Sequence, residues 1–502
     1  MVIDYSSAIH YLYALLPEFV LSAWAMLVLL VDVFQKGSRS GPSSPTIAWL
    51  TIGGIVLAGV ANAWLLQLQE TSSAGMMALD SFRIFTNYLF LLAALLFVLI
   101  AHRYLDEEHI RLGELYVLVM LATVGMMIFA GTRDLMVVFL GLELTSVPVY
   151  VLTGVNRRSR KSAEGALKYF LLGAFSSAFF LFGVALLYGG TATTNIAQIA
   201  TVIAGGAGSN LLVTGGMALL VVGFGFKVAA VPFHMWTPDA YEGAPAPVTG
   251  FMAAAVKAAA FAAFLRVFLT AFPGIHDAWS DLVFWLAAIT MIAANLVALV
   301  EANVKRMLAY SSIAHAGYLL VALNSGSQVG AASFLFYLVV YTLMTIGAFA
   351  VVIAVGGPGE ERVDIDSYAG LAWQKPLLGT VMTIFLLSLA GFPFTGGFIG
   401  KVYILQSAIG QGLVVLAVIL VLSSLASYWY YLRVVWYMWF HEAPAEAEAQ
   451  ARVIVPGGMR AALLAAAIGV MLLGIFPGPV LERAERSAET LVGTQAPALG
   501  NR

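Results

Sequence analysis

The chain has 502 residues, of which 61% are hydrophobic and only 10% are charged, and its net charge at pH 7 is −2. Soluble globular proteins have about 25% charged residues, so this composition excludes a soluble protein and indicates an integral membrane protein. The near-neutral charge excludes the basic surface that nucleic-acid binding requires. Because the chain has no cysteine, it cannot hold a disulfide, a thiolate zinc site or an iron–sulfur cluster.

Apolar segments of about 20 residues are long enough to cross a bilayer as helices. Fourteen such windows follow one another, and they predict an all-α polytopic membrane protein with about 14 transmembrane helices. No signal-peptide cleavage pattern follows the first window, so we expect it to remain in the protein. The windows are residues 15–34, 47–68, 82–101, 114–131, 134–154, 165–188, 211–231, 246–271, 280–300, 307–324, 330–354, 376–400, 411–437 and 459–477.

The basic residues predict how the chain is oriented, because cytoplasmic loops are enriched in lysine and arginine. The densest basic cluster lies at residues 157–168, between the fifth and sixth windows. If this cluster is cytoplasmic, the basic loops at residues 36–39 and 305–306 are cytoplasmic too, and the loop with Glu70 and Asp80 lies on the other side. We therefore expect a bacterial inner-membrane protein with both termini on the periplasmic side.

The windows group into four regions. Residues 1–113 hold helices 1–3, residues 114–272 hold helices 4–8, residues 273–440 hold helices 9–13, and residues 441–502 hold a cytoplasmic loop, helix 14 and a short tail. Two consecutive blocks of five helices must be inverted relative to each other. Pro232 follows Lys227 in helix 7, and Pro393 precedes Lys401 in helix 12. Broken helices beside ionisable residues at matching places in inverted repeats indicate a transport site.

Four ionisable residues inside or directly beside the windows are the first candidates, because a charge inside the membrane costs at least about 2.5 kcal/mol. Lys257 is ten residues beyond Pro247, too deep for its side chain to reach the membrane surface easily, and alanines flank it. Glu143 lies in the middle of the fifth window and needs a partner or a proton, for which Lys227 is the candidate. An uncharged run follows Lys401 and argues against a helix-end position. A static salt bridge between helices is the alternative for Glu143 and Lys227.

His315 is the fifth candidate, because it is the only ionisable residue in a long neutral stretch. A buried imidazole can relay protons near neutral pH, although a hydrogen-bonded structural histidine is nearly as plausible. Glu18 and Arg266 lie near window ends, where side chains that reach the headgroups are expected. The aromatic cluster at residues 428–439 is typical of an interfacial or lipid-facing surface.

Buried lysines suit proton transfer because burial favours the neutral amine, whereas a nearby carboxylate favours the charged one. A lysine balanced between these effects can gain or release a proton when its partner moves. A row of such lysines can pass a proton stepwise across the membrane.

Three long segments now identify a family. Residues 139–148 around Glu143, residues 223–249 around Lys227 and residues 257–266 resemble, in this order, the antiporter-like membrane subunits of respiratory complex I, the NADH:quinone oxidoreductase. The resemblance covers nearly the whole chain. It implies fourteen core helices, two inverted five-helix repeats and broken helices 7 and 12.

The resemblance also implies roles. Glu143 and Lys227 would form the charge pair that controls proton uptake, Lys257 would be the central relay, and Lys401 would be the terminal proton-transfer site. The chain would couple NADH oxidation and quinone reduction to proton translocation. It would bind no cofactor itself, because flavin and iron–sulfur clusters would lie in partner subunits. Its partners would be another antiporter-like subunit, small helical membrane subunits and the lipid bilayer.

Two alternatives remain open at this point. A subunit of a multisubunit sodium/proton antiporter shares the same glutamate and lysine positions without a redox partner. A non-transporting assembly subunit could use the same buried charges as static bridges.

Overall fold

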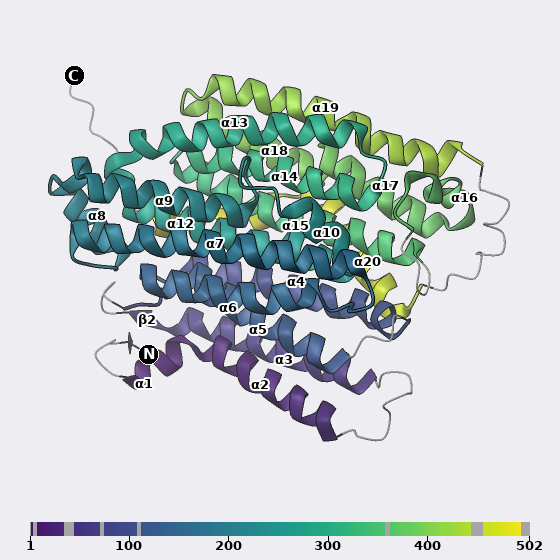
Figure 1. Ribbon diagram of the computed structural model, residues 1–502, viewed down its shortest axis with the longest axis horizontal. Coiled ribbons are helices and arrows are strands. Elements are labelled where there is room, and N and C mark those ends of the chain that lie inside the picture. Colours follow the sequence, from purple (N-terminus) through teal and green to yellow (C-terminus); the bar gives the residue numbers. More distant parts are fainter. Residues whose placement is uncertain are drawn as a thin grey trace.

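The protein is a bundle of nearly parallel and antiparallel helices, as the computed structural model shows (Figure 1). The structure describes residues 2–3, 8–34, 45–70, 75–107, 112–356, 362–442 and 455–492. The predicted basic loop at residues 36–39 and most of the predicted loop after residue 441 lie outside these residues. One end of the bundle carries the short helix α8 (Ile196–Ala204) and the other carries α16 (Leu371–Gln374), and we call them the α8 end and the α16 end.

The first part of the chain forms one edge of the bundle, except that its last helix lies farther into the bundle (Figure 1). Its strands pair in parallel, Val2 with Gln69 and Ile3 with Glu70. Its elements are β1 (Val2–Ile3), α1 (Ala8–Ala14), α2 (Leu16–Phe34), α3 (Pro45–Trp64), the 3₁₀ helix η1 (Leu65–Gln67), β2 (Gln69–Glu70) and α4 (Ser81–Glu107).

The next part contains the first broken helix. Chain direction reverses between α9 and α11 through the short helix α10. The elements are α5 (Leu112–Gly131), α6 (Leu135–Thr153), α7 (Arg160–Thr191), α8, η2 (Ala207–Ser209), α9 (Leu211–Val228), α10 (Thr237–Gly243), α11 (Ala246–Phe251), the π-helical turn η3 (Met252–Val256) and α12 (Lys257–Ala271).

The remaining part contains the second broken helix, α17 and α18. Its elements are η4 (Pro273–Ile275), α13 (His276–Val300), α14 (Val304–Asn324), α15 (Gln328–Val355), η5 (Ile365–Tyr368), α16, α17 (Pro376–Ala390), α18 (Gly396–Gly410), α19 (Val414–Phe440), α20 (Gly457–Ile475) and α21 (Gly478–Val492). The prediction of a short tail after helix 14 is thus wrong in part, because residues 478–492 form a helix that packs on α15 and α4.

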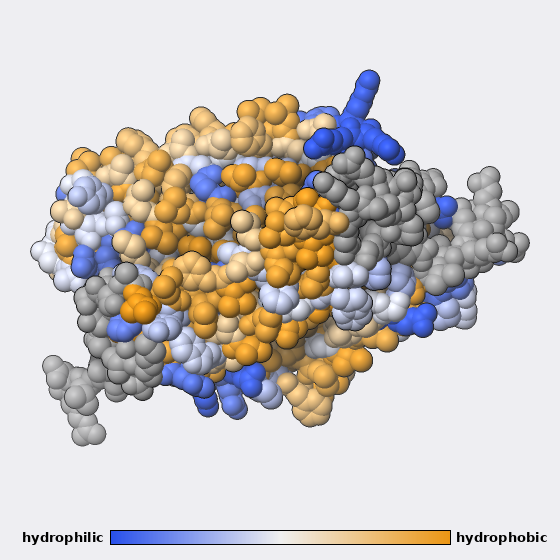
Figure 2. All heavy atoms as spheres, turned by 90° about the horizontal axis from the view of Figure 1, so that it is seen from below, coloured by the Kyte–Doolittle hydropathy of each residue, from blue (hydrophilic) through white to orange (hydrophobic). Residues whose placement is uncertain are grey.

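The spans agree with the predicted windows. Within the described residues, thirteen helices are long and apolar enough to cross a membrane. The twelfth window is the exception, because it corresponds to α17 and α18, which are separated at residues 391–395. Gly391 has a left-handed φ of +91°, a conformation that ends helices and that glycine adopts without strain. Figure 2 shows that apolar residues dominate the middle of one face, as expected of a membrane-facing surface.

The centre of the bundle is made by the spans at 246–271, 304–324 and 328–355. The first is entirely buried over its most apolar stretch, and the other two are 94% buried. In a bilayer, a helix buried on all sides faces protein rather than lipid. Polar side chains on these helices are therefore held in a protein interior, and the predicted site residues Lys257 and His315 lie there.

Candidate functional site

The four predicted basic residues of the site are all buried. The exposed fraction is 3% for Lys227, 2% for Lys257, 1% for His315 and 6% for Lys401. Each of them is hydrogen-bonded to a side chain or to a carbonyl group. Because a buried ammonium without partners would be very costly, the local folds that supply these partners are part of the site.

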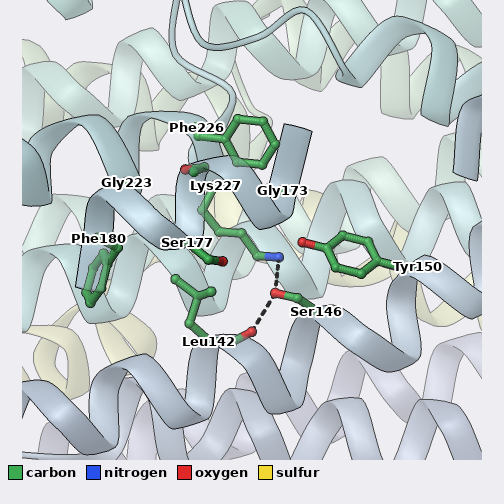
Figure 3. Close-up of a pocket in the computed structure, with 10 residues that line it drawn as sticks. Leu142, Ser146, Tyr150, Gly173, Ser177, Phe180, Gly223, Phe226 and Lys227 are labelled. Carbon is green, nitrogen blue, oxygen red and sulfur yellow. Dashed lines mark hydrogen bonds between the residues drawn. The ribbon is translucent and has the colours of Figure 1, made fainter. Parts of the chain in front are cut away.

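Lys227 lies in the last turn of α9, next to the first helix break. Its Nζ atom donates hydrogen bonds to Ser146 Oγ at 2.7 Å and to Tyr169 Oη at 3.3 Å. Figure 3 shows the side chain extended toward Ser146, with the Tyr150 hydroxyl on the far side of the amine. The ammonium also lies 5.8 Å from the centre of the Tyr150 ring. Neutral side chains of α6 and α7 therefore hold this lysine.

The predicted pairing of Glu143 with Lys227 is not made in this structure. Glu143 is half-buried on α6 and accepts a hydrogen bond from Ser177 of α7. No ion pair among the described residues joins it to Lys227. A small cavity of about 10 Å³ next to Ser146, Ser177 and Lys227 is close to the ~10–15 Å³ that one water molecule needs. The carboxylate and the ammonium are thus each hydrogen-bonded to a serine, and both serines line the same small cavity.

The break after α9 is stabilised by polar side chains from other elements. Ala229 has a left-handed φ of +61°, and Pro232 cannot donate a backbone hydrogen bond. Thr290 of α13 accepts from Val231 N at 2.9 Å, and Trp236 donates to Phe226 O at 3.0 Å. These bonds satisfy backbone groups that the helix end leaves without partners.

Lys257 is the first residue of α12 and follows the π-helical turn η3 directly. Such turns are frequent at functional sites because they change the direction of a side chain within a helix. The Lys257 Nζ atom donates to the carbonyl oxygen of Ser312 at 2.8 Å and to Ser312 Oγ. The prediction that Lys257 faces a protein interior is confirmed.

A stripe of polar residues on α14 continues from Ser312. Ser311, His315 and Tyr318 lie at the spacing of one helix face, and Ser312 is the neighbour of Ser311 in the chain; we call these four residues the α14 stripe. Tyr431 of α19 contacts both Ser311 Oγ and His315 Nε2, the latter at 3.2 Å, and His315 Nδ1 lies 2.6 Å from Tyr337 Oη. His315 is therefore a member of a hydrogen-bonded network.

Lys401 lies in α18 and reaches back to the break of the same helix pair. Its Nζ atom donates to the carbonyl oxygens of Leu389 and Ala390, both at 2.9 Å. These are the last carbonyls of α17, where the helix dipole favours a cation. The ammonium lies 4.8 Å from the centre of the Tyr318 ring. The α14 stripe thus contacts Lys257 at one place and Lys401 at another.

An ion cluster at the α16 end fixes α10. Arg306 Nη1 lies 2.7 Å from Glu242 Oε2, and Lys161 Nζ lies 2.8 Å from Glu242 Oε1. Lys305 donates to the carbonyl oxygens of Glu242 and Ala244. Burial alone would raise the pKa of Glu242, but the hydrogen bonds from Lys161 and Arg306 outweigh burial and lower this pKa. The two predicted cytoplasmic loops at 157–168 and 305–306 therefore meet at one end.

A second ion cluster lies at the opposite end. Arg266 Nη1 and Nη2 contact the two carboxylate oxygens of Asp80 at 2.7 and 2.9 Å. Burial would raise the pKa of Asp80, but the charge and hydrogen bonds of Arg266 lower it below its ordinary value. Arg83 Nη2 contacts Glu18 Oε1 at 2.8 Å. The expectation that Glu18 and Arg266 reach the headgroups is wrong, because each has a buried partner from a distant part of the chain.

Several residues of the site were not predicted. They are neutral and hydroxyl-bearing, which gives no signal in a search for buried charges, namely Ser146, Tyr169, Ser177, Ser311, Ser312, Tyr318, Tyr337 and Tyr431. The interpretation of residues 428–439 as a lipid-facing surface is wrong for Tyr430 and Tyr431, which are fully buried, although Trp429 and Trp436 are exposed. Among the described residues, no three histidine, aspartate or glutamate side chains gather as a metal site would require.

Comparisons with known proteins agree with this geometry. The family described as NADH:quinone oxidoreductase/Mrp antiporter, TM matches residues 132–427. NADH-quinone oxidoreductase subunit N of Trichlorobacter lovleyi is 48% identical over 95% of this chain and 97% of its own length. A chain of respiratory complex I from Thermus thermophilus with bound aureothin is 36% identical, covers 93% of this chain and 98% of its own, and superimposes with a TM-score of 0.76.

The antiporter relatives are more distant. A chain of the Mrp complex from Dietzia sp. DQ12-45-1b superimposes with a TM-score of 0.78 over 95% of this chain and 98% of its own, but is only 22% identical, which shows the shared fold alone. The opening residues 15–22 and the segment 241–245 also favour the N type of complex I subunit. The chain therefore belongs to the NADH:quinone oxidoreductase/Mrp antiporter family and, within it, to the NADH-quinone oxidoreductase N subunits.

Proposed function

We propose that this membrane subunit of NADH:quinone oxidoreductase moves protons along the row of buried cations, driven by NADH oxidation and quinone reduction elsewhere in the complex. The observation that carries the proposal is the α14 stripe, which connects the surroundings of Lys257 with those of Lys401. A static scaffold does not need hydroxyl and imidazole groups along a buried helix between two buried lysines. A proton relay does.

The first step of the relay concerns Lys227. Its ammonium is bound by Ser146 and Tyr169, while Glu143 is bound by Ser177. A small movement of α6 relative to α9 would bring the carboxylate of Glu143 and the ammonium of Lys227 into contact. This contact would favour the charged form of Lys227. When Glu143 and Lys227 separate again, Lys227 would lose its proton more easily. Glu143 and Lys227 thus form a switch that is open in this structure.

The central step passes from Lys257 to the α14 stripe. Lys257 donates to Ser312, the adjacent Ser311 contacts Tyr431, and Tyr431 contacts His315. Hydroxyl groups both donate and accept hydrogen bonds, and neutral imidazole does so through its two nitrogens. Proton transfer along this set requires a rotation of the Ser311 or Ser312 hydroxyl or a bridging water, because no hydrogen bond among the described residues joins these two serines.

The final step ends at Lys401 beside the second break. The two-block division at residues 114–272 and 273–440 gives Lys227 and Lys401 matching places, each next to a broken helix. In this arrangement the last carbonyls of α17 hold the charged Lys401. A movement of α18 relative to α17 at the break would remove these acceptors and release the proton of Lys401. We infer that the two blocks work as inverted halves of one channel.

The proposed role also determines the cofactors, the neighbouring subunits and the orientation that we expect for this chain. The electrons travel through flavin and iron–sulfur clusters in partner subunits, so this chain needs no cofactor of its own. Small helical subunits and another antiporter-like subunit flank it in the bilayer. The α16 end, with its basic loops, faces the cytoplasm, and both termini lie on the periplasmic side of a bacterial inner membrane.

The test is NADH-driven proton pumping by membrane vesicles that carry Lys257→Met. We expect acidification to fall at least tenfold while the complex assembles in normal amounts. Lys257→Arg keeps the charge and is expected to retain part of the activity. Lys168→Met serves as the control, because this lysine has a 44% exposed side chain outside the buried row.

The outcomes separate the competing functions. Unchanged acidification by an assembled Lys257→Met complex would overturn the relay and favour a structural role for the buried charges. Wild-type vesicles that acidify under a sodium gradient but not with NADH would favour the sodium/proton antiporter instead.

A further inference from the structure

A deep slot opens between α4 and α21 at the α8 end, away from the buried cations. Its volume is about 680 Å³. One wall is the α4 face made by Ser81, Ile84, Phe85, Tyr88, Leu89 and Leu92. Val339 of α15 and Leu66 of η1 complete its apolar part, and α21 forms the opposite wall.

The length of the slot matches one leaflet of a bilayer. Residues 81–92 rise by about 16 Å along α4, at 1.5 Å per residue. Half of the hydrocarbon core of a membrane is about 15 Å thick. The slot therefore starts at the polar end of α4, beside Ser81, and runs into the apolar interior beside Leu92, as an acyl chain does.

The polar end of the slot is cationic. Arg483 and Arg486 of α21 line it, and both are exposed. Among the described residues, no carboxylate lies within ion-pair distance of either guanidinium, and none lines the slot. At 100° per residue, Glu482 and Glu489 lie about 40° and 60° from Arg486 around α21, and Glu485 lies about 100° away. No ion pair among the described residues joins any of these glutamates to either arginine.

The carboxylate next to Ser81 in the sequence is not available to these arginines. Asp80 precedes Ser81, but it is buried and binds both terminal nitrogens of Arg266. Ser487 is also occupied, because its hydroxyl donates to Ser81 O at 3.2 Å and to Arg483 O at 2.7 Å. The second of these bonds and the buried residues Ala484, Ala488 and Leu491 fix α21 in place. The two arginines are thus held over the slot without an anionic partner.

From this combination we propose that the slot binds an anionic phospholipid, with the phosphate between Arg483 and Arg486 and an acyl chain along α4. Basic residues above an apolar groove between membrane helices are suited to acidic headgroups. A neutral lipid would fill the apolar part but would leave the guanidinium groups unmatched. A free phosphate would use only the arginines. An apolar helix of a neighbouring subunit would bury both charges without a partner, which is costly.

The test uses the purified complex in phosphatidylcholine nanodiscs to which photoactivatable phosphatidylglycerol is added in increasing amounts. Crosslinked peptides are then identified by mass spectrometry. We expect saturable labelling of residues 81–92 and 480–487. With about fivefold in affinity for each arginine near an anionic headgroup, Arg483→Gln with Arg486→Gln should raise the half-saturating lipid fraction by roughly 25-fold. Arg460→Gln, an exposed arginine at the other end of α20, is the matched control.

The other outcomes overturn the proposal. Equal labelling by photoactivatable phosphatidylcholine would show an apolar groove without charge selection. Loss of labelling with inorganic phosphate at millimolar concentration would show a phosphate site without a lipid. Absence of labelling in the wild type would show that a protein segment fills the slot. The comparison of the two lipids on the wild type remains decisive even if the double variant does not assemble.

Discussion

Lys227 Nζ donates a 2.7 Å hydrogen bond to Ser146 Oγ, although the half-buried carboxylate of Glu143 lies only one helical turn away on α6. The serine lies three residues after the glutamate, so both point to the same side of the helix. The lysine therefore has a neutral and an anionic acceptor within one small region. In this structure it uses the neutral one.

Ser146→Ala should disturb this balance. The variant removes a hydrogen bond to a charged group, which is worth about 1.5–3 kcal/mol, and the ammonium is expected to turn toward Glu143. We expect proton pumping to slow about tenfold or more, because the charged lysine becomes harder to deprotonate. The measurement is the initial rate of acidification per assembled complex.

Ser176→Ala is the control for Ser146→Ala. Ser176 lines the same cavity and is also buried, but no hydrogen bond of Lys227 goes to it. A similar loss of pumping in both variants would assign the effect to the cavity and not to the lysine.

Tyr431→Phe should interrupt the α14 stripe while preserving its packing. The tyrosine hydroxyl contacts both Ser311 and His315, and phenylalanine retains the ring. We expect slower NADH-driven acidification with normal assembly. The adjacent Tyr430→Phe is a matched control, because Tyr430 is equally buried and packs on Tyr431, but its hydroxyl donates to Asn295 Oδ1 at 3.0 Å and not to Ser311 or His315. Equal activities of the two variants would remove Tyr431 from the relay.

The sequence was sufficient to predict the spans and the breaks. Hydrophobic length is a local property of the chain, and Pro232, Pro393 and Gly391 mark places where a helix cannot continue regularly. The burial of Lys257 was also predictable, because a side chain so far from both window ends cannot reach water. These predictions need no knowledge of which helices become neighbours.

Contacts between distant helices were not predictable in the same way. Ser312 and Tyr431 are uncharged, so placing them in a membrane costs little and gives no signal. Glu18 lies near a helix end, where a headgroup contact and a buried ion pair are equally compatible with the sequence, and its partner Arg83 is 65 residues away. The helix α21 did leave a signal, because Ala484, Ala488 and Leu491 recur at helical spacing in the charged tail.

Arg266→Met should destabilise the protein strongly. The variant leaves the buried Asp80 carboxylate without its bidentate partner, and breaking a buried pair in this way costs about 3–5 kcal/mol. Arg266 also anchors the end of α12, whose first residue is Lys257. We expect a large fall in the melting temperature of the detergent-solubilised complex. Adding Asp80→Asn should restore part of it, since the unpaired charge is then removed. No recovery in the double variant would assign the loss to packing.

The pH dependence of stability should report the ion pairs of Glu242. Its pKa is lower in the folded protein than its ordinary value, so the unfolded chain binds the proton more tightly and stability falls as the pH falls. The stability that the Glu242 ion pairs contribute is fully present above about pH 4.3, the pKa of glutamate in the unfolded chain. This stability is lost as the pH decreases through the pKa of Glu242 in the folded protein. Glu242→Gln should therefore melt at a lower temperature than the wild type at pH 7, and the difference should shrink below about pH 4.3. Glu485→Gln, which changes an exposed glutamate outside any ion pair among the described residues, should show no such pH-dependent difference. A gap that stays constant from pH 7 to pH 3 would contradict the pairing of Glu242 with Lys161 and Arg306.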